Sequence, residues 1–304
     1  MTKASTATIV VEGLRKRYGD LVAVDGVSFS VEEGEFFGIL GPNGAGKTTT
    51  LEMIEGLREP DGGSVSLLGL SPWPRNPALL PRIGVQLQAN SFFDKLTARE
   101  QLETFASLYG IGRTKAADML GLVGLSDKAG TRENKLSGGQ RQRLSIACAL
   151  VHEPDVVFLD EPTAGLDPQA RRNLWDVLRA IQGKGRTIVC TTHYLDEAEA
   201  LCDRVAIMDH GRILALDAPA KLVRGLDAPT HVTLPHGVLP VERAAQLEAA
   251  DSANDDGVSL TIASRKPARL IEALAELGAL DGVAVRSATL EDVFLQLTGR
   301  EYRA

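Results

Sequence analysis

A glycine-rich segment that directly follows an apolar run constrains the fold of this chain more than any other feature. Residues 35–40 are mostly apolar, and the sequence GPNGAGKTT follows them from Gly41 to Thr49 before a helical pattern begins. This segment has the form G-x-x-x-x-G-K-[ST] and lies between a predicted strand and a predicted helix, which is the context that a phosphate-binding loop needs. We therefore predict an α/β protein with a phosphate site at a strand end.

The residue types of this loop suit a chain of phosphates. Glycines let backbone N–H groups turn inward around phosphate oxygens, and the following helix points the positive end of its dipole at them. The Lys47 side chain is expected to reach the outer phosphates, and the Thr48 hydroxyl to hold Mg²⁺. The residues predicted to bind the nucleotide here are Gly41, Pro42, Asn43, Gly44, Ala45, Gly46, Lys47, Thr48 and Thr49.

Two adjacent carboxylates end a second apolar run. Residues 156–159 read VVFL, and Asp160 and Glu161 follow them. Acids at the carboxyl end of a buried strand lie where ligands bind in open α/β sheets. Asp160 is expected on the Mg²⁺ side, which leaves Glu161 to orient and deprotonate a water that faces the γ-phosphate. Such a pair alone is more often a solvated strand end, but the phosphate loop in the same chain favours catalysis.

A second anion-binding pattern precedes the helix predicted to end at Leu150. The sequence at residues 136–140 is LSGGQ. Ser137 can cap the helix, and Gly138 and Gly139 let a ligand approach its positive end. In isolation, an ordinary capped helix is equally compatible with this pattern. A single chain that binds one nucleotide would need only one of these two phosphate sites.

These segments together resemble the ATP-binding-cassette family over about residues 8–217. The loop at 41–48 is similar to its Walker A segment, residues 156–161 to its Walker B segment, and residues 136–140 to its signature segment, to which Gln140 belongs. The resemblance implies ATP and Mg²⁺ as ligands and ATP hydrolysis as the activity.

The resemblance also implies roles for residues that carry no signal alone. Gln88 matches the Q-loop glutamine, a catalytic and Mg²⁺-binding position, although Gln86 is a competing candidate. Tyr18 matches the aromatic that stacks on adenine, Asp167 lies in the D-loop, and His193 matches the switch histidine. For each of these residues alone, a packing role is the simpler interpretation.

The order of predicted elements indicates two domains. The resemblance implies a P-loop NTPase, RecA-like core with an antiparallel β subdomain and a helical subdomain at about 90–150, all within a nucleotide-binding domain at 1–220. Central strands are predicted at 35–40, 156–159, 187–191 and 204–208, and helices at 98–109, after a cap at Thr97, and at 114–122. Turn residues near 218–229 mark the boundary with a small C-terminal α+β unit at 221–304, an accessory or dimerisation domain. Its predicted strands are 231–234, 258–263 and 283–286, and its predicted helices 241–250, 267–277 and 290–297.

The composition and charge of the chain indicate which partners it lacks and where in the cell it works. Its 304 residues include 33 Lys plus Arg against 40 Asp plus Glu, a net charge of −7, which argues against binding to nucleic acid through positive charge. The sequence shows no secretory signal and no membrane-spanning run. We expect a cytoplasmic protein, peripheral on the inner face of the cell membrane.

The resemblance implies the cytoplasmic ATP-hydrolysing subunit of an exporter, working through separate integral membrane permease subunits. Residues 290–300 are similar to the C-terminal signature of cassettes that serve exporters of drugs, antibiotics and polysaccharides, and a lipid substrate is equally compatible. In this family each ATP lies between the Walker A segment of one cassette and the signature of another, which implies a homodimer. Phe92 and Phe93 are expected either to face the membrane partner or to lie in the core.

Three alternatives stay open from the sequence. The chain could be a soluble cassette ATPase that acts on ribosomes or DNA, although it lacks a second cassette, sustained heptads and a basic run. It could be a regulatory binder with little hydrolysis, which the presence of Glu161 and His193 disfavours. It could also serve import.

Overall fold

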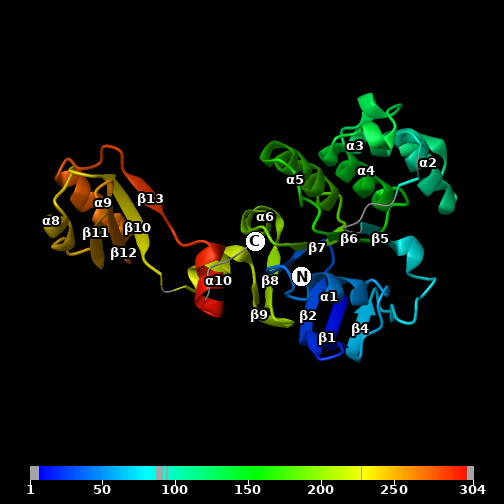
Figure 1. The fold of residues 1–304 in the computed structure, drawn as a ribbon, viewed down its shortest axis with the longest axis horizontal. Coiled ribbons are helices and arrows are strands. Elements are labelled where there is room, and N and C mark those ends of the chain that lie inside the picture. The colour runs from blue at the N-terminus through cyan, green and yellow to red at the C-terminus, as the bar shows by residue number, and fades with distance from the viewer. Residues whose placement is uncertain (1–6, 87–91, 94, 227, 300–304) are drawn as a thin grey trace, which may run out of the picture. The chain divides into compact units, whose positions relative to one another are not determined.

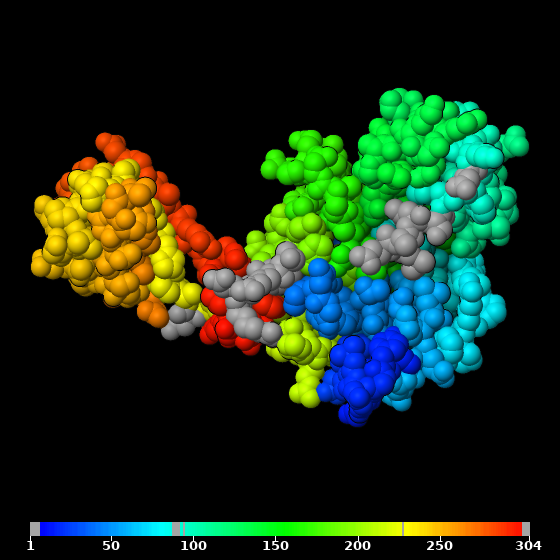
Figure 2. Space-filling view, viewed as in Figure 1, coloured from blue at the N-terminus to red at the C-terminus, as the bar shows by residue number. Residues whose placement is uncertain are grey.

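The computed structural model describes residues 7–86, 92–93, 95–226 and 228–299. It divides into two compact units (Figure 1 and Figure 2). The division falls between Pro219 and Ala220. Each unit is described by itself.

A six-stranded sheet forms the centre of the first unit, with the strand order β5-β6-β7-β3-β8-β9. Every residue of β3, β6 and β7 is buried, as expected for parallel strands that are covered on both faces. β9 pairs antiparallel with β8 at one edge. The four predicted central strands are confirmed, and the bounds are β3 (Phe36–Leu40), β5 (Ile83–Gln86), β6 (Val156–Asp160), β7 (Thr187–Thr192), β8 (Arg204–Asp209) and β9 (Arg212–Asp217).

An antiparallel sheet of order β2-β1-β4 completes the β structure of this unit and confirms the predicted β subdomain. Its strands are β1 (Ala7–Tyr18), β2 (Leu21–Glu32) and β4 (Gly62–Leu67). Phe29 on β2 stacks on Phe37 of β3 with ring centroids 4.9 Å apart, so one apolar core joins the two sheets. α1 (Lys47–Ile54) packs between them.

The predicted helical subdomain is present as α2 (Ala98–Leu108), α3 (Arg113–Leu122) and α4 (Gly138–Leu150). Thr97 and Ser137 form capping boxes with Glu100 and Gln140, which stabilises each helix by about 1 kcal/mol. The remaining elements of the unit are η1 (Leu80–Arg82), η2 (Ser126–Lys128), η3 (Glu133–Lys135), α5 (Pro168–Gln182) and α6 (Leu195–Leu201); α7 (Pro219–Arg224) crosses the division.

The second unit has its own four-stranded sheet of order β11-β12-β10-β13, and α9 and the apolar face of this sheet form its core. Its elements are β10 (Thr230–Pro235), α8 (Val241–Ala245), β11 (Ser252–Asp255), β12 (Ser259–Ser264), α9 (Pro267–Glu276), β13 (Ala284–Arg286) and α10 (Leu290–Thr298). The helix expected at 241–250 ends five residues early. β11 was not predicted because its sequence, SAND, has no apolar alternation.

Candidate functional site

The phosphate loop lies between β3 and α1, as the sequence predicts, and its backbone carbonyls bind the side chain of Lys47. Gly46, which immediately precedes α1, has φ 99°, a left-handed conformation that favours glycine. Lys47 is buried, and its ammonium group donates hydrogen bonds to the carbonyl oxygens of Gly41 at 2.8 Å and Pro42 at 3.1 Å. Two backbone carbonyls of the loop therefore hold this positive charge in place.

Glu161 lies between Lys47 and His193, two of the other three residues expected to act in catalysis. Its Oε1 is 3.2 Å from Lys47 Nζ, and its Oε2 is 3.2 Å from His193 Nδ1. Its backbone has φ 46°, a left-handed conformation that costs a non-glycine residue about 1–2 kcal/mol. The Glu161 N–H donates to Thr191 Oγ1 at 2.9 Å, which holds this strained residue at the end of β6. Strain of this kind concentrates at functional sites.

Asp160, the last residue of β6, is oriented by two hydroxyl groups. Thr191 Oγ1 donates to its carboxylate at 2.5 Å, and Thr48 Oγ1 lies 3.1 and 3.2 Å from its two oxygens. Burial raises the pKa of Asp160, while the hydrogen bonds from Thr191 and Thr48 act in the opposite direction. These bonds hold the carboxylate facing the N-terminus of α1.

The pair formed by Thr48 and Asp160 suits Mg²⁺. Octahedral Mg²⁺ binds hard oxygen ligands at about 2.0–2.1 Å, so two neighbouring ligand oxygens are about 2.9 Å apart. The 3.1 Å between Thr48 Oγ1 and Asp160 Oδ1 is close to this separation. The described residues contain no cluster of three or more His, Cys, Asp or Glu side chains that could hold a metal ion by themselves. Phosphate and water oxygens usually complete such a Mg²⁺ site.

Thr191 is the residue that sequence reasoning missed. It lies on β7, pairs in register with Asp160, and holds both carboxylate residues of the site. A signal existed, because β7 also ends in polar residues after an apolar run, and parallel neighbours end at the same edge of a sheet.

The second predicted anion site lies on a different part of the same unit. Ser137 caps α4 as predicted: its Oγ accepts from the Gln140 N–H at 3.3 Å, and Gln140 Oε1 accepts from the Ser137 N–H at 2.9 Å. α4 packs against α2, α3, α5, β5 and β6, whereas α1 packs against β1, β2, β4, β6 and β7 (Figure 1). Ser137 and Gly138 are exposed, while Gly139 lies close to Ala170.

The remaining predicted residues of the described part lie on or next to other elements of the first unit. Asp167 caps α5, because its Oδ1 accepts from the Gln169 and Ala170 backbone N–H groups. Tyr18 is 41% exposed at the end of β1, as a stacking surface must be. Gln86 is buried at the end of β5. Gln88 lies outside the described residues.

Comparison with known proteins identifies the relatives of this chain. The family model described as "ABC transporter" matches residues 24–164. The Nod factor export ATP-binding protein I of Ralstonia nicotianae is 41% identical and is aligned over 98% of this chain and 96% of its own length. The protein of the same name from Burkholderia orbicola is 42% identical, over 98% of this chain and 99% of its own length.

Solved structures cover a smaller share of the chain. The cbiO1 protein of Clostridium perfringens, described as part of the ABC transporter complex cbiONQ, superposes with a TM-score of 0.67 at 30% identity over 72% of this chain and 91% of that chain. The ADP conformation of an ATP-binding cassette of an ABC transporter gives a TM-score of 0.65 at 26% identity, over 71% of this chain and 93% of that chain. Within the described part of our chain, no helix has the length and apolar character needed to cross a membrane.

Proposed function

Because this chain belongs to the ATP-binding-cassette transporter family, we propose that it is the ATPase subunit that drives export through a separate membrane protein. One observation favours export over the other functions left open by the sequence. Three solved cassettes match 71–72% of this chain, about the share of its first unit. Two Nod factor export proteins match 98% and thus extend over the C-terminal unit as well.

The geometry of the site supports a hydrolytic mechanism. The phosphates of ATP bind the backbone N–H groups of the loop and the positive end of α1, and Lys47 binds their outer oxygens. Those oxygens compete with Glu161 for Lys47, which frees the Glu161 carboxylate to accept a proton from the attacking water. The water oxygen bonds to the γ-phosphorus as the bond to the β-phosphate oxygen breaks, giving ADP and inorganic phosphate.

His193 and Asp160 have supporting roles in this proposal. His193 lies 3.2 Å from Glu161, where it can orient the carboxylate or contact the γ-phosphate. Thr48 and Asp160, together with Gln88, are the residues we assign to Mg²⁺. The ion, when bound, neutralises charge on the phosphate oxygens.

A second copy of the chain would explain the second anion site. The helical part of the unit contains the segment of Ser137, Gly138, Gly139 and Gln140, which forms the start of α4, and the N-terminus of this helix can accept an anion. We propose that the loop of one copy and this segment of another enclose one ATP. Asp167 and Tyr18 are assigned to the same nucleotide.

The membrane partner is the second element of the proposal, and it places the protein at the inner face of the membrane, in the cytoplasm. Phe93 is 51% exposed and tilts against Phe105 with ring centroids 6.1 Å apart, while Phe92 is half-buried. Neither ring is a fully buried core residue, which favours contact with a partner. Drug, antibiotic, lipid and polysaccharide substrates all remain compatible, because the membrane subunit contacts the substrate.

The C-terminal unit is proposed to assist assembly, but its predicted apolar stripe is mostly occupied. Leu290, Val293 and Phe294 of α10 are buried within the chain, whereas Leu297 is 40% exposed. The alternative of a soluble ATPase acting on ribosomes or DNA is not favoured, because the relatives reported above are export proteins by name.

Copurification from the native host tests the proposal. Glu161→Gln is expected to retain ATP and to hold the assembled state, so a membrane-spanning protein should copurify in stoichiometric amount and only with Mg-ATP. Recovery of ribosomes or nucleic acid, with no membrane-spanning protein, would contradict the export function. The wild-type chain with ADP serves as the control for non-specific recovery.

A further inference from the structure

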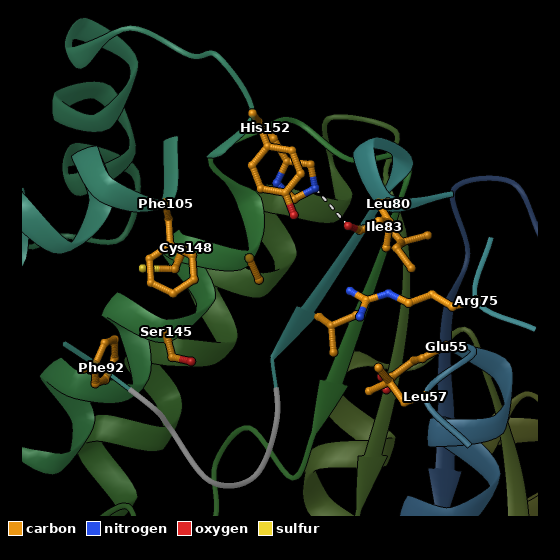
Figure 3. A pocket seen from close by; sticks show the side chains of 13 residues that line it. Glu55, Leu57, Arg75, Leu80, Ile83, Phe92, Phe105, Ser145, Cys148 and His152 are labelled. Carbon is orange, nitrogen blue, oxygen red and sulfur yellow. Dashed lines mark hydrogen bonds between the residues drawn. The ribbon is translucent and has the colours of Figure 1, made fainter. Parts of the chain in front are cut away.

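The first unit contains a cavity of about 380 Å³ that the nucleotide site does not use (Figure 3). Its walls come from the end of α1, from β5, α2 and α4, and from the segment before β5. Most of the lining is apolar or aromatic, including Leu57, Ile83, Phe92 and Phe105. A cavity of this size can take a protruding side chain of another protein.

Glu55 is an acidic side chain in this largely apolar lining. The residue is only 6% exposed, and neither of its carboxyl oxygens has a hydrogen-bond partner among the described residues. Burial raises the pKa of Glu55 well above its ordinary value, and the nearby Asp160 and Glu52 raise it further. A buried carboxyl group without a partner destabilises the chain that carries it. A cationic group supplied by another protein would therefore stabilise this carboxyl group.

The position of Glu55 on α1 also favours a cation. It is the C-cap residue, next to the last backbone carbonyls of the helix, which carry partial negative charge. The last turn of α1 has no basic residue to balance this charge. Arg75 lies in the same lining (Figure 3), but it forms no ion pair with Glu55 in the described part of the chain. The cavity thus combines an unpaired carboxyl group with a negative helix end.

We propose that Glu55 receives a lysine or arginine side chain of the membrane subunit, and so selects by charge the segment that binds in this cavity. The inference rests on the proposed function. The apolar and aromatic walls suit the aliphatic stem of such a side chain, and the carboxylate suits its charged end. A guanidinium group fits best, because it can donate two parallel hydrogen bonds to one carboxylate.

Binding of the purified chain to the membrane subunit recovered by copurification tests this proposal. Glu55→Gln, which keeps the shape and removes the charge, is expected to weaken binding at least about 30-fold. Its basal ATP hydrolysis should stay within about twofold of the wild type, because Glu55 takes no part in the catalytic site. Glu55→Met provides a second variant, and the thermal unfolding of both should show that the unit still folds.

Glu59→Gln is the matched control. Glu59 lies four residues after Glu55, is exposed and is outside the cavity lining, so the loss of its charge should leave binding unchanged. Double-mutant cycles then pair Glu55→Gln with neutralisation of each cytoplasmic lysine and arginine of the membrane subunit. One of these residues should show coupling of about 10-fold or more, and exchanging the two charges should restore binding.

Three outcomes would overturn the inference while leaving the export function intact. The first is wild-type affinity of Glu55→Gln for the membrane subunit. The second is a set of double-mutant cycles in which the effect of Glu55→Gln on binding simply adds to the effect of neutralising each basic residue of that subunit. The third is stronger coupling to Arg75→Gln, which would make Arg75 the partner of Glu55. Failure of the wild-type chain to bind any membrane subunit would instead overturn the proposed function.

Discussion

Glu161→Gln is expected to reduce ATP hydrolysis by at least about 100-fold while leaving ATP binding close to the wild-type level. General-base catalysis typically contributes about 10²–10⁴-fold to a rate, and glutamine cannot accept the proton that the attacking water must lose. The amide has nearly the same shape as the carboxyl group. It also removes the negative charge that pairs with Lys47 at 3.2 Å, so this lysine stays available to the phosphates.

The measurement is steady-state phosphate release, with nucleotide affinity measured separately by calorimetry. Glu59→Gln is the matched control, because Glu59 is exposed and lies outside the site. Wild-type turnover by Glu161→Gln would show that another group accepts the proton. Loss of ATP binding together with turnover would instead assign Glu161 a role in shaping the loop.

Gly46→Ala is expected to destroy the nucleotide site, with a loss of ATP affinity of 100-fold or more. Gly46 has φ 99°, and a Cβ atom built there would lie 2.2 Å from the carbonyl oxygen of Ala23 and 3.0 Å from Met208 Cε. The loop would have to leave this conformation, which moves Lys47 away from the phosphate position. The free energy of unfolding of the first unit should fall by about 2–4 kcal/mol.

Gly44→Ala separates the steric clash from backbone strain. Gly44 has φ 81°, but nothing lies within 4 Å of a Cβ atom built there. Its substitution should therefore cost only about 1–2 kcal/mol of backbone strain. Thermal and chemical unfolding of both variants provides the comparison. Equal destabilisation by the two substitutions would mean that the close approach of Ala23 does not constrain the loop.

Local sequence patterns predicted the parts of the site that one segment can build. The phosphate loop needs only a strand, a glycine-rich turn and a helix in succession, and Thr97 and Ser137 satisfy their helix ends within four residues. These features depend on neighbours in the chain. They were therefore predictable without knowledge of the fold.

Features that depend on distant residues were not predictable in this way. The position of Thr191 beside Asp160 follows from the pairing of β6 with β7, which no single segment determines. The φ of 46° at Glu161 and its contact with Lys47 arise from the closed site. Glu55 follows the apolar residues of α1 and reads as an ordinary helix residue until the cavity beside it is seen. β11, with its polar sequence, depends on β12 for its conformation.

The most direct test of our account is a cross-link across the proposed shared nucleotide site. Asn43 of the phosphate loop and Ser137 are both exposed, whereas Cys148, Cys190 and Cys202 are all buried. A chain with Asn43→Cys, Ser137→Cys and Glu161→Gln therefore gains two accessible thiols, and oxidation of these thiols can be followed by the mass of the product.

We predict a covalent dimer that forms with Mg-ATP and not without nucleotide, and not when either cysteine substitution is omitted. A product that stays monomeric under saturating Mg-ATP, or that forms equally well without nucleotide, would contradict the claim that two copies of this chain enclose one ATP between the phosphate loop and the LSGGQ segment.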